Sequence, residues 1–147
     1  MKVIIGSDHG GFHLKTAVIK FLEDLGYTTE DVGTYSEDSC DYPVIASKLT
    51  KKVLETGSKG ILICGTGIGM AITANKVPGI RAAVAHDIFS LERMIKSNNC
   101  QVLCMGARII APQSAELLLD RWLEIEFKDG PSTPQVEKIM EIENEYR

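Results

Sequence analysis

The sequence has no long hydrophobic run and no cluster of basic residues. No segment approaches the roughly 18 consecutive apolar residues of a membrane-spanning helix. The apolar run Val3–Ile5 is also too short for the h-region of a secretory signal, which needs about 7–15 residues. We therefore expect a cytoplasmic protein that does not enter a membrane. The net charge of −4, from 16 basic and 20 acidic residues, argues against a nucleic acid as the partner.

Cysteine is scarce, and its spacing does not favour a metal site. The four cysteines are Cys40, Cys64, Cys100 and Cys104, and in a cytoplasmic protein they are expected to be reduced thiols. Cys100 and Cys104 are four positions apart, but no further Cys or His pair lies near them to complete a zinc set. The sequence thus predicts no disulfide scaffold, no metal and no other cofactor.

The sequence does contain short apolar segments that alternate with longer amphipathic segments, within a length typical of one domain. The segments expected to be strands are Lys2–Gly6, Thr28–Val32, Gly60–Cys64, Ile80–Ala85 and Gln101–Met105. Those expected to be helices are Phe12–Leu25, Pro43–Leu54, Met70–Lys76, Ile88–Lys96, Gln113–Phe127 and Gln135–Tyr146.

This order predicts an α/β fold: a Rossmann-like three-layer α/β/α sandwich with a five-stranded parallel sheet and a C-terminal helix. No linker is visible, so residues 1–147 are expected to form a single domain. The terminal helix follows a breaker segment at 129–134. Packing of this helix on its own domain and packing against another chain both stay open.

Chemically useful side chains follow the predicted strands. Asp8 and His9 follow the first strand, Cys64 ends the third, His86 follows the fourth, and Arg108 follows the fifth. Ligands of open α/β sheets bind outside the carboxyl ends of the strands. We therefore expect these residues to share one edge of the sheet.

Each of these side chains also has an ordinary structural interpretation. Asp8 fits the N-cap of the first helix, with His9 incidental; alternatively, His9 holds a phosphate or relays a proton. His86 is a surface or capping residue, or it belongs to the site. Cys64 is a small buried hydrophobe, or a base, because a thiol beside a helix N-terminus loses its proton more readily than a free one.

The segment Gly65–Gly69 reads Gly-Thr-Gly-Ile-Gly and precedes a predicted helix. Alternating glycines let the backbone approach a ligand closely, and a helix N-terminus presents free N–H groups to negative charge. A nucleotide-binding G-x-G-x-x-G loop is one alternative, with Asp87 as the acidic residue about 20 positions on. The third glycine, however, comes one place too early. A loop that serves packing alone is the other alternative.

Together these motifs resemble ribose-5-phosphate isomerase type B, a family that includes the galactose-6-phosphate isomerase subunits. The resemblance covers nearly the whole chain and is carried by Ser7–Gly11, Asp31–Tyr35, Asp41–Pro43, Ile63–Gly69, Ala74–Lys76, Gly79–Ala82 and Gly106–Arg108. It implies metal-free aldose–ketose isomerisation of a sugar phosphate through a cis-enediolate, first of all ribose 5-phosphate to ribulose 5-phosphate. It also implies a homodimer or homotetramer with its sites at the dimer interface.

The resemblance further implies a role for each site residue. Cys64 would move the proton between C1 and C2, because the alternative glutamate base of some members is replaced here by Met70. Thr66 and Asp8 would handle the hydroxyl protons. The substrate-binding residues would be His9, Gly65, Gly67, Ile68, Gly69, Asn98 and Arg108, with His9 and Arg108 on the phosphate.

Three positions depart from the family pattern. Ser97 stands where many members carry the histidine that opens the furanose ring, and Pro131 and Gln135 replace two phosphate-binding arginines. One explanation is another substrate, a tetrose 4-phosphate or a hexose 6-phosphate, since a tetrose 4-phosphate cannot form a furanose. Another is that His86 opens the ring. A third, from a different class, is a non-catalytic partner subunit of a heteromeric isomerase.

Overall fold

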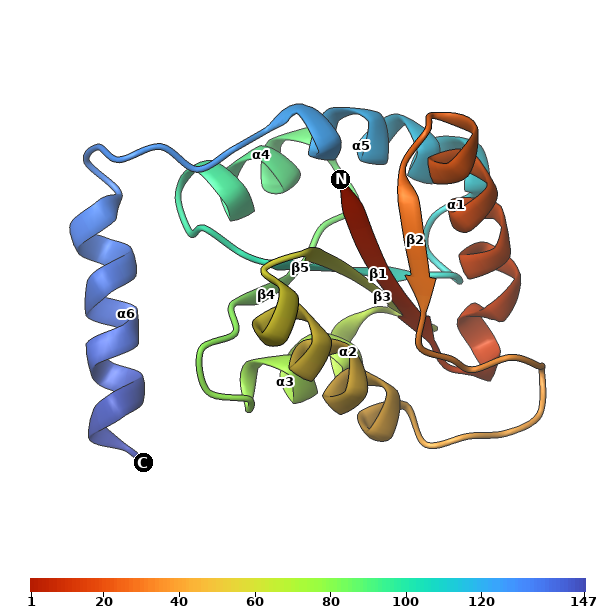
Figure 1. Cartoon of the computed structure of the whole chain (residues 1–147), viewed down its shortest axis with the longest axis horizontal. Coiled ribbons are helices and arrows are strands. Elements are labelled where there is room, and N and C mark those ends of the chain that lie inside the picture. The colour runs from red at the N-terminus through yellow and green to blue at the C-terminus, as the bar shows by residue number, and fades with distance from the viewer.

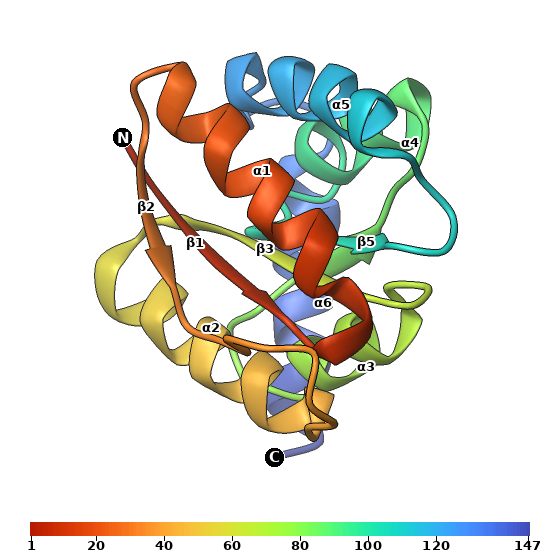
Figure 2. The same cartoon turned by 90° about the vertical axis from the view of Figure 1, so that its right-hand side faces the viewer.

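A computed structural model describes residues 1–147 as a parallel sheet between two layers of helices (Figures 1 and 2). The five strands lie in the order β2-β1-β3-β5-β4. The strands are β1 (Lys2–Ser7), β2 (Thr28–Asp31), β3 (Lys59–Cys64), β4 (Ala82–Val84) and β5 (Val102–Gly106). The helices are α1 (Phe12–Asp24), α2 (Tyr42–Thr56), α3 (Ile68–Asn75), α4 (Ile88–Lys96), α5 (Pro112–Glu124) and α6 (Thr133–Glu145), and a 3₁₀ turn, η1 (His9–Gly11), precedes α1.

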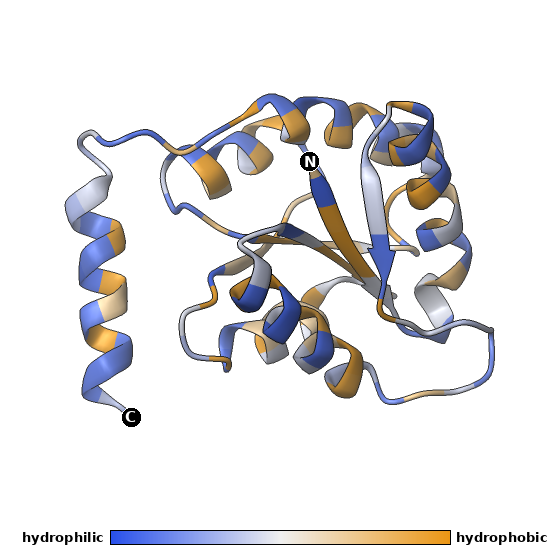
Figure 3. Cartoon of the chain, in the orientation of Figure 1, coloured by the Kyte–Doolittle hydropathy of each residue, from blue (hydrophilic) through white to orange (hydrophobic).

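The central strands are apolar on both faces because helices cover both faces. Along β3, Ile61 and Ile63 belong to the core shared with α1, α4 and α5, whereas Leu62 and Cys64 belong to the core shared with α2 and α3. Figure 3 shows the hydrophobic stretches of β1 and β3 between the two helical layers. The predicted three-layer α/β/α architecture with five parallel strands is confirmed.

The register of the sheet brings the segments that follow β1, β3 and β5 to the same edge. Ser7 at the end of β1 lies opposite Ile63, and Cys64 at the end of β3 lies opposite Gly106 at the end of β5. The segments that follow these strands therefore leave the sheet side by side. This edge is the carboxyl edge at which the sequence predicts the ligand site.

Several predicted element boundaries differ from the structure by one to three residues, and two of the differences have a clear physical cause. The helix predicted to reach Phe127 ends at Glu124, because Ile125 has an extended backbone and its carbonyl accepts a hydrogen bond of 3.0 Å from the Lys59 ammonium. The strand predicted from Ile80 begins at Ala82, because the Arg81 amide donates instead to the side chain of Gln101 at 2.8 Å.

The terminal helix α6 lies beside the β4 edge, apart from both helical layers (Figure 1). No residue of α6 belongs to either core cluster. The helix is attached through the buried side chain of Val136, through Glu143 Oε2, which accepts the Gly79 amide at 3.1 Å, and through the contact of Arg81 with Met140. None of the helices in the chain has the length and apolar character needed to cross a membrane.

Candidate active site

A cavity of about 480 Å³ opens at the carboxyl edge of the sheet. Six residues that the sequence predicts for the site line it: Asp8, Cys64, Gly65, Thr66, Ile68 and Gly69. Tyr42 and Ile72 complete the lining. The structure therefore brings the end of β1, the end of β3 and the start of α3 together around one space.

Cys64 is the last residue of β3, and its sulfur lies at the start of the loop that leads into α3. The Gly67 amide donates a hydrogen bond to Cys64 Sγ at 3.1 Å. The residue is only 6% exposed, yet it lines the cavity. The sulfur is therefore shielded from bulk water, but it faces the space that a small ligand would fill.

Two of the other cysteines are unsuited to proton transfer. Burial raises the pKa of the Cys100 thiol to about 11 and raises the pKa of the Cys104 thiol still further. Neither residue lines the cavity, so both fit the prediction of buried structural thiols. Cys40 is half-buried in the loop before α2.

The loop after Cys64 presents unused backbone donors. The N–H groups of Gly65, Thr66 and Gly69 donate to no acceptor in the protein. The Ile68 amide, in contrast, donates to Thr66 Oγ1 at 3.2 Å. Free amides at a helix N-terminus, close to a reacting carbonyl, are the usual donors to an oxyanion. This arrangement fits a ligand on which negative charge develops.

Glycines allow the loop to lie directly against the end of β5. Gly67 has φ +82°, and a Cβ at this position would lie 3.0 Å from the Met105 carbonyl carbon. A Cβ on Gly106 would lie 2.6 Å from Thr66 Cα. Main-chain hydrogen bonds fix the contact, because Ala107 N donates to Cys64 O at 2.8 Å.

Asp8 and His9 approach the cavity from β1. Asp8 Oδ1 accepts the Gly11 amide at 3.0 Å, so Asp8 caps the 3₁₀ turn η1 and not α1 itself, whose N-cap is Gly11. The other carboxylate oxygen has no partner in the protein, and Asp8 lines the cavity. His9 Nδ1 accepts the Cys40 amide at 3.3 Å. In the neutral ring, the proton is therefore on Nε2, which is free to donate.

Arg108 lies just beyond the end of β5, and its side chain is an unpaired cation. Its Nε lies 3.7 Å from the place that a Cβ on Gly65 would occupy, while its own amide donates to Gly65 O at 3.0 Å. The guanidinium makes no hydrogen bond or ion pair within the protein. The Arg108 guanidinium therefore lies beside the free amide of Gly65 and is available to bind an anion.

His86 has a structural partner. Its Nε2 accepts the Gly106 amide at 2.8 Å, so the ring holds the end of β5. Burial lowers the pKa of His86, although the neighbouring carboxylate of Asp87 opposes this shift. The neutral ring carries its proton on Nδ1. His86 does not line the cavity, and only Nδ1 would remain for the ring opening that the sequence predicts.

Asn98 does not lie at this edge within one chain, so its contact with the substrate stays a prediction that requires the cavity of a partner subunit. It lies in the turn between α4 and β5, where its carbonyl accepts Arg81 Nε at 3.1 Å. That turn precedes Val102, which pairs with Gly60 near the start of β3, whereas Cys64 is at the end of β3. The length of the sheet therefore separates Asn98 from Cys64.

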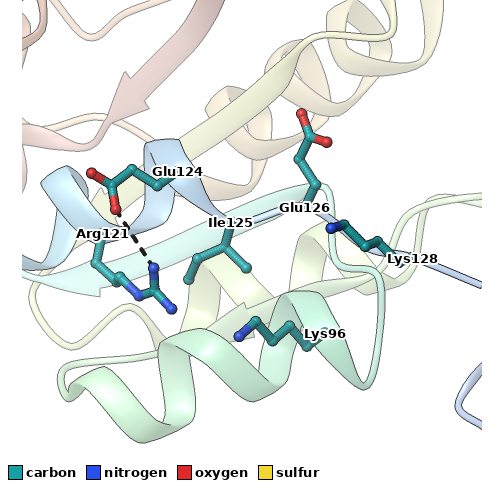
Figure 4. A pocket seen from close by; sticks show the side chains of 6 residues that line it. All are labelled: Lys96, Arg121, Glu124, Ile125, Glu126 and Lys128. Atoms are coloured by element: carbon teal, nitrogen blue, oxygen red, sulfur yellow. Dashed lines mark ion pairs between the residues drawn. The ribbon is translucent and has the colours of Figure 1, made fainter.

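A second cavity, of about 490 Å³, lies at the opposite, amino-terminal edge of the sheet (Figure 4). Its lining consists of Lys96, Arg121, Glu124, Ile125, Glu126 and Lys128. Arg121 is already paired with Glu92 at 2.7 Å and with Glu124 at 3.5 Å. This cavity has neither a thiol nor a histidine, and it does not resemble the predicted site.

Tyr42 and Ile72 line the cavity although no sequence motif assigns them to the site. A Cβ on Gly69 would lie 2.6 Å from the Tyr42 ring, so the glycine makes room for this wall. Ile72 is 57% exposed and lies one helical turn after the equally exposed Ile68. The available signal was this apolar i, i+4 pair on a helix directly after the glycine loop.

The fold and the site define a class of protein: a parallel α/β domain that offers a thiol, free amides and an arginine to a small anionic ligand. A family model described as "Ribose/Galactose Isomerase" matches residues 3–139, and the chain belongs to this family. The family predicted from the sequence motifs is thereby confirmed.

Individual relatives match along almost the whole chain. "Ribose-5-P isomerase B" of Listeria innocua is 45% identical, with 100% of each chain covered. "D-erythrulose-4-phosphate isomerase 2" of Mycolicibacterium smegmatis is 43% identical, covering 97% of this chain and 95% of the relative. The solved structure of ribose-5-phosphate isomerase B from Clostridium thermocellum superposes with a TM-score of 0.97 at 42% identity, covering 100% of both chains.

Proposed function

We propose that this protein interconverts an aldose phosphate and a ketose phosphate, with ribose 5-phosphate and ribulose 5-phosphate as the principal pair. One observation carries the proposal: the Cys64 sulfur lies beside backbone amides that have no other acceptor. A base next to preorganised donors is what proton transfer through an enediolate requires. The ribose 5-phosphate activity named for the Listeria and Clostridium relatives supports the choice of substrate.

In the proposed reaction the Cys64 thiolate removes the proton from C2 of the open-chain aldose. The C–H electron pair forms the C1–C2 double bond of a cis-enediolate, and the carbonyl oxygen gains the negative charge. The free amides of Gly65, Thr66 and Gly69 stabilise this charge, by about 3–4 kcal/mol per donor. The thiol then returns the proton to C1 to give the ketose.

The hydroxyl proton moves from O2 to O1 in the same reaction. Thr66 and Asp8 line the cavity and are the proposed carriers of this proton. The Thr66 hydroxyl accepts the Ile68 amide but donates its own proton to no protein group, and the second Asp8 oxygen accepts from no protein donor. His9 Nε2 and the Arg108 guanidinium are the proposed phosphate contacts. Both side chains are exposed, next to the lining residues Asp8 and Gly65, although neither lines the cavity itself.

A tetrose 4-phosphate is the second candidate substrate. Ser97 stands where many members have the ring-opening histidine, and His86 Nε2 is already occupied by the Gly106 amide. A tetrose 4-phosphate needs no ring opening, because its 4-oxygen carries the phosphate. Relatives named as D-erythrulose-4-phosphate isomerases match at 43% identity. The nucleotide-binding alternative has no comparable support.

The experiment ranks tetrose, pentose and hexose phosphates by kcat/KM with wild-type enzyme, Cys64→Ala and Cys40→Ala. We expect ribose 5-phosphate to rank first, and Cys64→Ala to lose isomerisation while its thermal unfolding stays close to that of the wild type. Cys40→Ala is the matched thiol control and keeps its turnover. Near-normal turnover by Cys64→Ala, or no exchange of deuterium from solvent into the sugar, would exclude the mechanism.

We further propose that the active form is a cytoplasmic homodimer or homotetramer whose sites are completed by a partner subunit. Asn98 and Ser97 lie at the amino-terminal edge, so within the assembly they meet a Cys64 cavity only across an interface. Exposed apolar side chains are available on α6, where Ile139 and Ile142 are 43% and 47% exposed. Sedimentation of Ile142→Glu should give monomers with little activity. A stable monomer that is fully active would refute the shared site, and a pure chain with no activity would favour the non-catalytic subunit.

A further inference from the structure

Lys15 is a buried cation outside the cavity. It lies in the first turn of α1, is 1% exposed, and donates to Asp31 Oδ1 at 2.7 Å and to the Thr34 carbonyl. Its ammonium also lies over the rings of Phe12 and Tyr35, at 5.6 and 5.3 Å from their centroids. A charge is buried at this level only when its partners are arranged around it.

Nearly all the partners of Lys15 belong to the loop 32–41, which joins β2 to α2, or to the residue just before it. Asp31 Oδ1 also accepts the Gly33 amide at 2.9 Å, and the Tyr35 hydroxyl donates to the Asp31 carbonyl at 3.0 Å. The first half of the loop is therefore folded around the Lys15 ammonium. The hydrophobic cores do not include these contacts.

The second half of the same loop reaches the candidate active site. The Cys40 amide donates to His9 Nδ1 at 3.3 Å, and the next residues lead into α2, where Tyr42 lines the cavity. In between, Glu37 forms an exposed ion pair with His13. The loop is thus attached to the η1–α1 segment at both ends, at Lys15 and at His9.

We propose that Lys15 is a positioning residue for the active site. Its charge holds the start of the loop 32–41, and the loop in turn keeps the Cys40 amide on His9 and Tyr42 against the cavity. His9 is thereby held in the orientation and tautomer in which Nε2 can donate to phosphate. This part of the inference rests on the proposed function, whereas the link between Lys15, Cys40 and His9 does not.

The first test compares Lys15→Met with Lys59→Met in steady-state kinetics and thermal unfolding. Lys59 is the matched control, because it is also a partly buried lysine that donates to a carbonyl, Ile125 O at 3.0 Å, and lies over an aromatic ring, Trp122 at 5.1 Å, but at the far edge of the sheet. We expect Lys15→Met to raise KM about tenfold with kcat changed less than about threefold, as loss of a ground-state contact does. Lys59→Met should lower the melting temperature and leave KM unchanged.

The second test does not depend on activity. Hydrogen exchange at the Cys40 amide and the NMR signals of the His9 ring should change in Lys15→Met, while the ring signals of His86 stay constant because its partner is Gly106. If the wild type showed no isomerase activity, this measurement would still test the positioning. Unchanged Cys40 exchange together with unchanged KM would overturn the proposal.

Two further variants separate positioning from folding. Tyr35→Ala removes the ring over Lys15 at a position that is 68% exposed, so the protein should fold even where Lys15→Met does not. It should reproduce part of the KM increase. In a His9→Ala background, Lys15→Met should raise KM by a smaller factor than in the wild type, because one of its two routes to the site passes through His9. Fully additive effects would contradict that route.

Discussion

Replacing Arg108 by alanine isolates the proposed phosphate contact from folding. The Arg108 side chain is exposed, has no hydrogen bond or ion pair in the protein, and lies beside the Gly65 loop. Its removal therefore leaves no buried partner without a bond, and the melting temperature should stay within the error of the measurement. Only the interaction with the ligand is lost.

The magnitude follows from the chemistry of the contact. A hydrogen bond to a charged group contributes about 1.5–3 kcal/mol, and each 1.4 kcal/mol is a factor of ten. Because the phosphate does not change during isomerisation, the contact stabilises ground state and transition state equally. We therefore expect KM to rise roughly 10- to 150-fold with kcat nearly constant.

The assay is initial-rate kinetics over a wide range of ribose 5-phosphate concentration, with inorganic phosphate as a competing ligand. Inhibition by phosphate should weaken by the same factor as KM. Lys48→Ala is the control, since it removes an equally exposed cation from α2, away from the cavity. If Arg108→Ala lowered kcat at constant KM, or if Lys48→Ala had the same effect, the assignment of Arg108 to the phosphate would be refuted.

Three further predictions concern the scaffold of the site. Gly67→Ala should cost about 1–2 kcal/mol of unfolding free energy for the positive φ alone, and it should also reduce kcat, because the loop amides move; denaturant titration and kinetics check both. Burial lowers the pKa of His86 below its usual 6.5, so at acidic pH the unfolded chain binds a proton more readily than the folded protein. The free energy of unfolding should therefore fall as the pH drops below about 6.5. His86→Gln keeps an acceptor for Gly106 and should lose less stability between about pH 7 and 5 in thermal melts. Leu103 is fully buried in the larger core, so Leu103→Ala should lower the free energy of unfolding by about 3 kcal/mol and leave KM unchanged. A change in KM would contradict this separation of core and site.

The fold could be predicted because the local patterns agree with the tertiary structure. Strand β3 is apolar at every buried position, and the helices have apolar residues at helical spacing, so each element can be predicted from its own stretch of sequence. The errors lie at boundaries set by contacts between distant residues. Neither the hydrogen bond from Lys59 to the Ile125 carbonyl nor that from the Arg81 amide to the Gln101 side chain can be predicted from a short stretch of sequence.

The site was predictable to the extent that it follows the ends of strands. The segments after β1, β3 and β5 meet as expected, because parallel register requires it. The position of Asn98 was not predictable in this way, since its role was taken from the resemblance, which does not specify on which edge of one chain a residue lies. The buried position of Lys15 was also hidden, because a lysine on a helix is normally solvated.

Because α6 lies outside both hydrophobic cores, the folding of the domain and the assembly of its copies depend on different parts of the chain. The sheet and its two helical layers hold every residue proposed for the chemistry and bury both cores without any help from α6. A shortened chain ending near Glu126 should still refold reversibly while losing self-association. Substitutions in α6 can therefore change how copies assemble, and with it the completion of the proposed shared sites, while the folding of the sheet and its two cores stays unchanged.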